Sequence, residues 1–340
     1  MRRKCQNILL LLVCTFYSSS SQTGGTHVYQ FLNLMHSGIA ASLGGSNVSL
    51  MSGDVNLAYC NPSLLSTEMH NNLALNYVNY FAGINYGMSL YSFTLPGIGN
   101  AATGITYLNY GSFRETDESG VITGAFSAAE YALSLIFSRE LDSSFTAGIS
   151  VRPVLSHLEK YSSFGMAIDL GIAWHSHDGL TSAGAVIRNA GLQITTYHGE
   201  KRENLPFEIQ AGISHKLAHA PFRFSVTGRH LEKFDLTHDY ETSPGTAGSG
   251  FLEDFARHLV IGAEVLPHRN FYVSAGFNYQ RRKELMVESK SSMSGFSWGF
   301  GINTAYLSVG FGRASFHLAG ASNHFSLVVR PDMIYKKIKD

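Results

Sequence analysis

A serine between two glycines is the first arrangement in this sequence that could do chemistry. Gly295, Ser297 and Gly299 fit the pattern G-x-S-x-G, which presents a nucleophilic serine in α/β-hydrolases. That chemistry requires a sharp turn from strand to helix, which exposes the serine. Here the motif lies in an unbroken two-residue alternation that continues to Ile302. We therefore interpret Ser297 as an inward-facing strand residue and predict no catalytic site.

A second candidate is a cluster of possible metal ligands. His175, His177 and Asp178 are close in sequence, and two histidines with a carboxylate are a plausible ligand set. They fall in an expected tight turn, and no further ligand is recognisable. We interpret them as a solvated turn and predict no metal site.

Two other enzyme signatures are missing from the sequence. A penicillin-binding enzyme needs S-x-x-K together with K-T-G and S-D-N, and none of these occurs. The nearest approach to a phosphate-binding glycine loop, Gly97 and Gly99, lacks the third glycine. The protein is predicted not to be an enzyme and to bind no cofactor.

The composition is that of an exported protein with few charges. Charged residues make up 15% of the chain, against roughly 25% in typical soluble domains. Positive and negative residues balance, which argues against a nucleic-acid partner.

The N-terminus has the layout of a signal peptide. Arg2, Arg3 and Lys4 precede an apolar run at 8–17 and small residues at 18–21. The run is too short for a membrane anchor, and Val13 before Cys14 disfavours a lipoprotein signal. Removing residues 1–22 leaves Cys60 as the one cysteine, so no internal disulfide is expected.

After the leader, the dominant pattern is strict alternation of large apolar residues with small or polar ones. In 164–174 the large residues form one face, and the other carries Gly165, Ala167, Asp169, Gly171 and Ala173. The apolar faces of several such segments begin and end in aromatic residues, as expected for girdles at two bilayer interfaces. The small or polar faces also carry charges, which are Glu130, Arg152, Asp169, Arg223 and Glu264.

The connections between these segments alternate in length. Short turns are expected at 95–99, 139–143, 175–179, 216–221 and 266–270, and long polar loops at 111–127, 188–205, 230–256 and 280–294. This indicates an all-β, transmembrane, antiparallel outer-membrane β-barrel of about fourteen strands.

The stretch before the first strand does not alternate. Residues 26–70 contain turns at 43–45 and 61–65 and are expected to form one short helix. They either plug the lumen from the periplasmic side or lead into the first strand. The expected parts are thus a signal peptide at 1–22, a periplasmic, plug-like segment at 23–70, the barrel at 71–331 and a C-terminal tail at 332–340.

The long loops are the expected binding surface. The charge runs 200–203 and 281–284 either contact lipopolysaccharide phosphates or a partner's acidic face, or keep the loops soluble. The loops 188–205 and 230–256 combine aromatic with charged residues, which suits an interface with a surface protein.

Several longer pieces of the sequence resemble a known family. They are residues 25–34, 54–59 with 61–62, 76–81, 161–165 and 216–223. They extend over nearly the whole chain after the leader and resemble the PorQ family, outer-membrane components of the type IX secretion system. Residues 61–64 also resemble the wider FadL-like group of fatty-acid-transporter barrels.

The resemblance implies a barrel in the outer membrane of a Gram-negative bacterium that anchors a cell-surface attachment complex. Its implied partners are the surface protein PorZ, the sortase PorU and the sister barrel PorV, with the sortase chemistry in PorU. The alternative hypothesis is a FadL-like transporter of hydrophobic molecules. A transporter is expected to line its lumen with a continuous apolar path, whereas an anchor is expected to have a filled lumen. The resemblance favours the anchor.

Overall fold

The structure is a computed structural model. It describes residues 27–80, 83–197, 199, 201–234, 236, 251–285, 293–317 and 320–339. The expected signal peptide at 1–22 lies outside these residues. Within them, no helix is long and apolar enough to cross a membrane.

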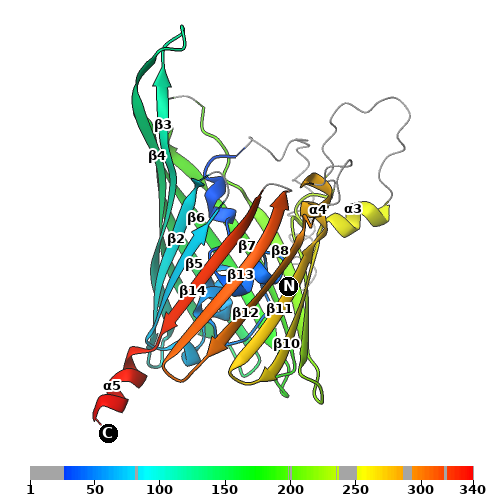
Figure 1. The fold of residues 1–340 in the computed structure, drawn as a ribbon. Coiled ribbons are helices and arrows are strands. Elements are labelled where there is room, and N and C mark those ends of the chain that lie inside the picture. The colour runs from blue at the N-terminus through cyan, green and yellow to red at the C-terminus, as the bar shows by residue number, and fades with distance from the viewer. Residues whose placement is uncertain are drawn as a thin grey trace, which may run out of the picture.

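Fourteen antiparallel strands close into one barrel (Figure 1). Each strand pairs with the next along the chain, and β1 closes the barrel by pairing with β14, with Leu73 opposite Val329. The all-β barrel and its strand number are therefore confirmed. The strands are β1 Asn72–Asn79, β2 Asn85–Leu95, β3 Gly99–Thr116, β4 Ile122–Glu140, β5 Phe145–Leu158, β6 Tyr161–His175, β7 Thr181–Thr195, β8 Glu208–Lys216, β9 Phe222–Gly228, β10 Leu259–His268, β11 Phe271–Asn278, β12 Phe296–Asn303, β13 Leu307–His317 and β14 Gly320–Val329.

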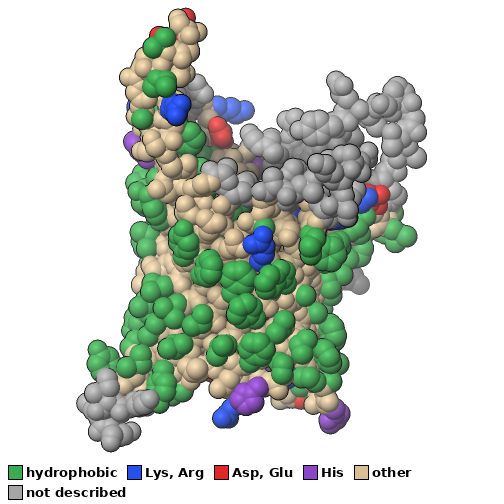
Figure 2. Space-filling view, in the orientation of Figure 1, with side chains coloured by type: hydrophobic (Ala, Val, Ile, Leu, Met, Phe, Trp, Pro, Cys, Tyr) green, Lys and Arg blue, Asp and Glu red, His purple; other side chains and the backbone are tan. Residues whose placement is uncertain are grey.

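On most strands the alternation places large apolar side chains outside the barrel and small or polar ones inside. β2–β4 differ, since Leu90, Leu108 and Ile136 face inward and pack in apolar clusters with the plug. In β12, Phe296 and Trp298 are exposed while Ser297 between them is buried. Figure 2 shows the result as a band of hydrophobic side chains around the visible wall. This is the surface that an outer-membrane barrel presents to lipid.

The two ends of the barrel differ as predicted. All five expected short turns join strands at one end, here called the turn end, which also holds the β12–β13 turn at 304–306. The other connections between strands lie at the opposite end, here called the loop end. The loop expected at 188–205 begins later than predicted, because β7 continues to Thr195. A second loop prediction is wrong: 111–127 is not a polar loop. β3 and β4 continue through it as a hairpin that rises beyond its neighbours (Figure 1), with Phe113 opposite Phe126 and their ring centroids 5.2 Å apart. The other loops contain the helices α3 Phe251–Arg257 and α4 Tyr279–Leu285.

The segment before β1 lies inside the barrel rather than beyond its periplasmic mouth. It enters at the loop end, where His27 pairs with Asn204, and reaches β1 at the turn end. In place of one short helix it has α2 Gly38–Ser42 and four 3-10 turns, which are η1 Gln30–Asn33, η2 Val55–Tyr59, η3 Pro62–Leu64 and η4 Thr67–Met69. Residues 27–70 are called the plug below. The expected C-terminal tail forms the helix α5 Pro331–Lys339 at the turn end.

A charge on the lipid-facing wall tests this arrangement. Ile168 is in the middle of β6 and faces outward, so Ile168→Arg is expected to destabilise the barrel by about 2–4 kcal/mol. Urea unfolding in lipid vesicles measures this. The matched control is Ile122→Arg on the projecting hairpin, which should be nearly neutral because Ile122 already meets water. Equal effects at both positions would show that the lipid-facing surface is wrongly assigned.

Candidate functional site

The plug is held by hydroxyl groups of the inward strand faces. The Ser297 hydroxyl donates to the carbonyl of Ser42 at 2.9 Å and accepts from the amide of Gly44 at 2.9 Å. Ser326 accepts from the amide of Gly38 at 2.9 Å. These bonds satisfy plug backbone groups that water cannot reach, so the small polar faces form a binding surface for the plug.

Glycines on the same faces let the plug backbone approach the wall. A Cβ at Gly312 would lie 2.2 Å from the carbonyl oxygen of Gly38, and one at Gly184 would lie 2.1 Å from that of Val48. Both are far inside contact distance, so no side chain fits at either position. Close packing against the plug therefore explains why glycine recurs on the inward faces.

A charged layer crosses the lumen at mid-height. Arg152 on β5 pairs with Asp169 on β6 and also donates to the Asn189 side chain at 2.9 Å. Its guanidinium lies 5.0 Å from the ring centroid of Tyr59 in the plug. Arg152 and Asp169 are both fully buried, so the pair is screened from water and each charge depends on the other.

Two further ion pairs extend this layer toward the ends. Glu208 accepts two bonds from Arg229, at 2.8 and 3.0 Å. Nearer the turn end, Glu264 accepts two bonds from Arg223, at 2.7 and 2.9 Å. Both are bidentate pairs of the strong kind. All four groups face inward and help to fill the lumen.

Above the plug, at the loop end, is a pocket of about 400 Å³. Its lining comes from plug, strands and loops together and mixes polar side chains with apolar and aromatic ones, which include Leu34, Met35, Tyr80, Tyr86 and Phe316. The Tyr86 hydroxyl donates to the Met35 carbonyl at 2.7 Å, which fixes the plug against β2. We call this cavity the external pocket.

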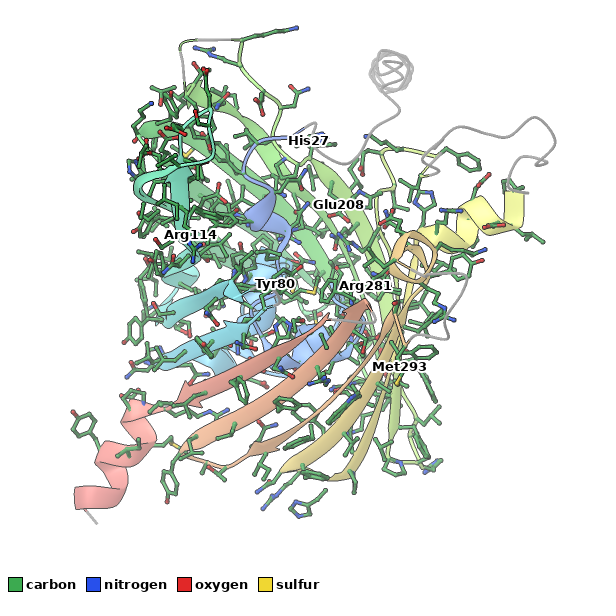
Figure 3. The ribbon with its side chains drawn as sticks, turned by 45° about the horizontal axis from the view of Figure 1, so that its top comes forward. His27, Tyr80, Arg114, Glu208, Arg281 and Met293 are labelled. Carbon is green, nitrogen blue, oxygen red and sulfur yellow. The ribbon has the colours of Figure 1, made fainter. Side chains whose placement is uncertain are left out.

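Within the described parts of the chain, one cation that lines the external pocket has no ion pair at contact distance, although Glu284 lines the same pocket. Arg281 on α4 is buried, and its Nη1 has no hydrogen-bond partner. No carboxylate among the described residues pairs with it, whereas its guanidinium lies 4.3 Å from the Phe316 ring centroid. Figure 3 labels Arg281 and Tyr80 at the mouth of the barrel. An anionic group in the pocket would find a ready partner there.

Burial and repulsion by Arg229 lower the pKa of Arg281 to about 10. The group is therefore still charged at neutral pH, although its charge is poorly compensated. Gly45 permits this position, because a Cβ there would lie 2.7 Å from the Arg281 Nη2. Gly45 also has a φ of 104°, which favours glycine.

The external pocket does not continue into an open pore. Leu34 and Met35 form its floor, and beneath them is a void of only about 10 Å³ beside Tyr59 and Arg188, room for roughly one water molecule. Passage of any larger molecule requires the plug to move.

The motifs singled out in the sequence occupy different places. Ser297 is on a continuous strand and binds the plug, so the strand-to-helix turn that a nucleophile needs is absent from its position. His175 ends β6, and Asp178 lies in the following turn, where it accepts from the amide of Leu180 at 3.0 Å. Among the described residues no group of three potential ligands could hold a metal ion.

The inward charges were predicted correctly from alternation, since Glu130, Arg152, Asp169 and Glu264 are all buried. The run 281–284 was expected in a loop but forms most of α4. Its first residue, Arg281, turns into the lumen. Glu208 and Arg229 were missed as lumen charges, because they lie at strand ends where alternation stops. Arg188 was missed because it was assigned to the loop expected at 188–205, whereas it lies within β7 beside a register shift. In the run 200–203, Lys201 and Arg202 are exposed and Glu200 lies outside the described residues.

Known proteins share this fold. No protein-family model and no curated protein matches the chain. Among solved structures, it is similar to the Pseudomonas putida toluene transporter TodX, with a TM-score of 0.52, 13% identity, and coverage of 87% of this chain and 96% of that one. The deltaS2 mutant of TodX, a monoaromatic hydrocarbon channel, gives a TM-score of 0.53, 14% identity, and coverage of 87% and 97%. The chain thus has the fold of the TodX barrel.

The charged layer makes a prediction about stability. Asp169→Ala leaves Arg152 as an unpaired buried cation and is expected to cost about 3–5 kcal/mol of unfolding free energy. Urea unfolding in lipid vesicles measures it. The control is the double variant Arg152→Met with Asp169→Leu, which removes both charges and should cost clearly less. Equal losses in the two variants would contradict the role of the pair.

Proposed function

We propose that the protein is an outer-membrane channel for a small amphipathic molecule, hydrophobic with an anionic group, which binds in the external pocket above the plug. The observation that carries the proposal is the uncompensated Arg281 in a pocket with aromatic walls. Ligand sites combine apolar linings with a few placed polar groups. The TodX-like architecture supports a barrel of the transporter type.

The plug supplies the closed state of such a channel. Leu34 and Met35 separate the external pocket from the small void below. Tyr86 holds the Met35 carbonyl, and Arg188 donates to the Leu32 carbonyl at 3.2 Å. A ligand that competes for these contacts would loosen the plug at 32–35. The hydroxyl contacts that hold the plug deeper in the barrel would persist. Opening the channel therefore requires only a local rearrangement of the plug, and the plug stays in the lumen.

Binding of two probes with one chain length tests the proposal. Titration of the purified barrel with dodecanoate and with dodecanol separates the anionic group from the hydrophobic tail. Arg281→Leu is expected to weaken dodecanoate binding by roughly tenfold to a hundredfold, and to leave dodecanol binding unchanged.

The matched control is Arg114→Leu on the projecting hairpin, where the arginine is exposed (Figure 3). This substitution should change the binding affinity of neither dodecanoate nor dodecanol. Absence of saturable dodecanoate binding, or an equal affinity in the native protein and Arg281→Leu, would overturn the proposal.

A second candidate function is the anchor of the type IX attachment complex, with PorZ, PorU and PorV as partners. It is favoured by the filled lumen and by the projecting hairpin. Beyond Asn109 in β3 and before Ala128 in β4, the two strands pair only with each other. Val121 and Ile122 are exposed near the tip. A rigid hairpin with free edges and apolar residues is a suitable docking element for a surface protein.

Affinity capture after mild detergent extraction tests this second candidate. Ile122→Asp is expected to abolish co-purification of proteins identified as PorZ and PorU, because it places a charge in the docking surface. Leu141→Asp, at an exposed position of the turn end, should leave capture intact. If the native protein captures none of these partners, the anchor function is wrong.

A further inference from the structure

An unusual set of exposed apolar side chains lies at the rim of the loop end. On α3, Phe251 is 68% exposed, Leu252 79% and Phe255 51%. Phe234, which is 61% exposed, adds to them, with its ring centroid 5.8 Å from that of Phe251. Together these four residues, here called the rim patch, are among the most exposed large apolar side chains of the protein. An apolar patch at one place on the surface marks an interaction site.

The opposite side of α3 is polar and fixed in place. Glu253 pairs with Arg257 at 3.2 Å, one helical turn away, and with Lys283 of α4 at 2.9 Å. The pair with Lys283 links α3 to α4. The helix therefore has one face turned to the protein and a separate apolar face, formed by residues spaced as neighbours on one side.

The orientation of α3 points to what covers the rim patch. Figure 1 shows α3 projecting sideways from the barrel wall, crosswise to the barrel axis, at the level where β10 and β11 end. Ile261 of β10 lies just below and faces outward in the lipid-facing band. Figure 2 shows hydrophobic side chains at the position of α3 that continue into this band. The rim patch thus extends the lipid-facing surface.

We propose that α3 and Phe234 lie in the outer leaflet of the membrane, with the rim patch inserted among lipid acyl chains. A helix parallel to the bilayer plane, apolar on one face and charged on the other, is the form of an interfacial membrane helix. A protein partner is the less favoured occupant, because the patch is continuous with the lipid-facing wall. The apolar tip of the β3–β4 hairpin, by contrast, lies far above this level (Figure 1).

The membrane contact has a consequence for the external pocket. Because Glu253 pairs with Lys283, lipid that holds α3 also holds α4. The same helix α4 directs Arg281 into the pocket. Membrane lipid therefore helps to position the pocket cation, whatever the pocket binds, and the placement of α3 does not depend on the proposed function.

Spin labels at single cysteines test the placement. The protein, with Cys60→Ala, is reconstituted in vesicles of phosphatidylethanolamine and phosphatidylglycerol and labelled at Leu252→Cys or Phe255→Cys. Ile261→Cys provides the lipid reference, and Ile122→Cys at the hairpin tip provides the water reference. Collision rates of the label with oxygen, which concentrates in lipid, and with a water-soluble nickel chelate give the environment of each position.

The ratio of oxygen to nickel collisions at Leu252 and Phe255 is expected to match that at Ile261 and to exceed that at Ile122 several-fold. A ratio like that of Ile122 would overturn the proposal and favour a protein partner that is absent from the vesicles. Labels shielded from both reagents would overturn it as well, because they would show that protein covers the patch. Two labelled positions on α3 guard against one variant failing to fold.

Discussion

The need to fill a wide lumen governs most of this structure. A barrel of about eight strands is filled by its own side chains, and larger barrels enclose a space. Here fourteen strands enclose it, and the plug occupies it. Where the plug backbone touches the wall, inward positions are small or hydroxylated, because the backbone takes the room that larger side chains would use. Ser297 illustrates this, since its single hydroxyl satisfies both a carbonyl and an amide of the plug.

Filling the lumen with charged groups carries a desolvation cost, so these groups need partners. Arg152 and Asp169 are buried together, and the desolvation cost of such charges is offset only by close pairing and further hydrogen bonds. Asn189 and Tyr59 provide these contacts, so the charged layer connects wall and plug. Arg281 lacks such compensation. Arg152 at mid-height has a carboxylate partner, whereas Arg281 at the mouth has none at contact distance among the residues that the structure describes, and this contrast makes the external pocket the better candidate for a ligand.

The loop end combines three different surfaces. α4 directs Arg281 inward, α3 presents the rim patch outward, and the β3–β4 hairpin rises above both. A charge inside the mouth suits an anionic ligand, an apolar helix crosswise to the axis suits lipid, and a free hairpin edge suits a protein. The turn end is simpler, with short connections and α5.

The sequence by itself determined the barrel wall, because strand alternation and turn residues are local properties. The lipid-facing residues, the five short turns and inward charges such as Asp169 could all be read from neighbouring positions. The hairpin was missed, since glycine and charge in 111–127 resemble a loop and only pairing between β3 and β4 reveals strands. The plug contacts and the external pocket were decided by tertiary structure alone. Gly44 and Ser297 are 253 residues apart, and Arg281 differs from its neighbour Arg282 only in the direction that α4 gives it. No local pattern records such contacts, because they arise when the closed wall brings distant segments around one plug.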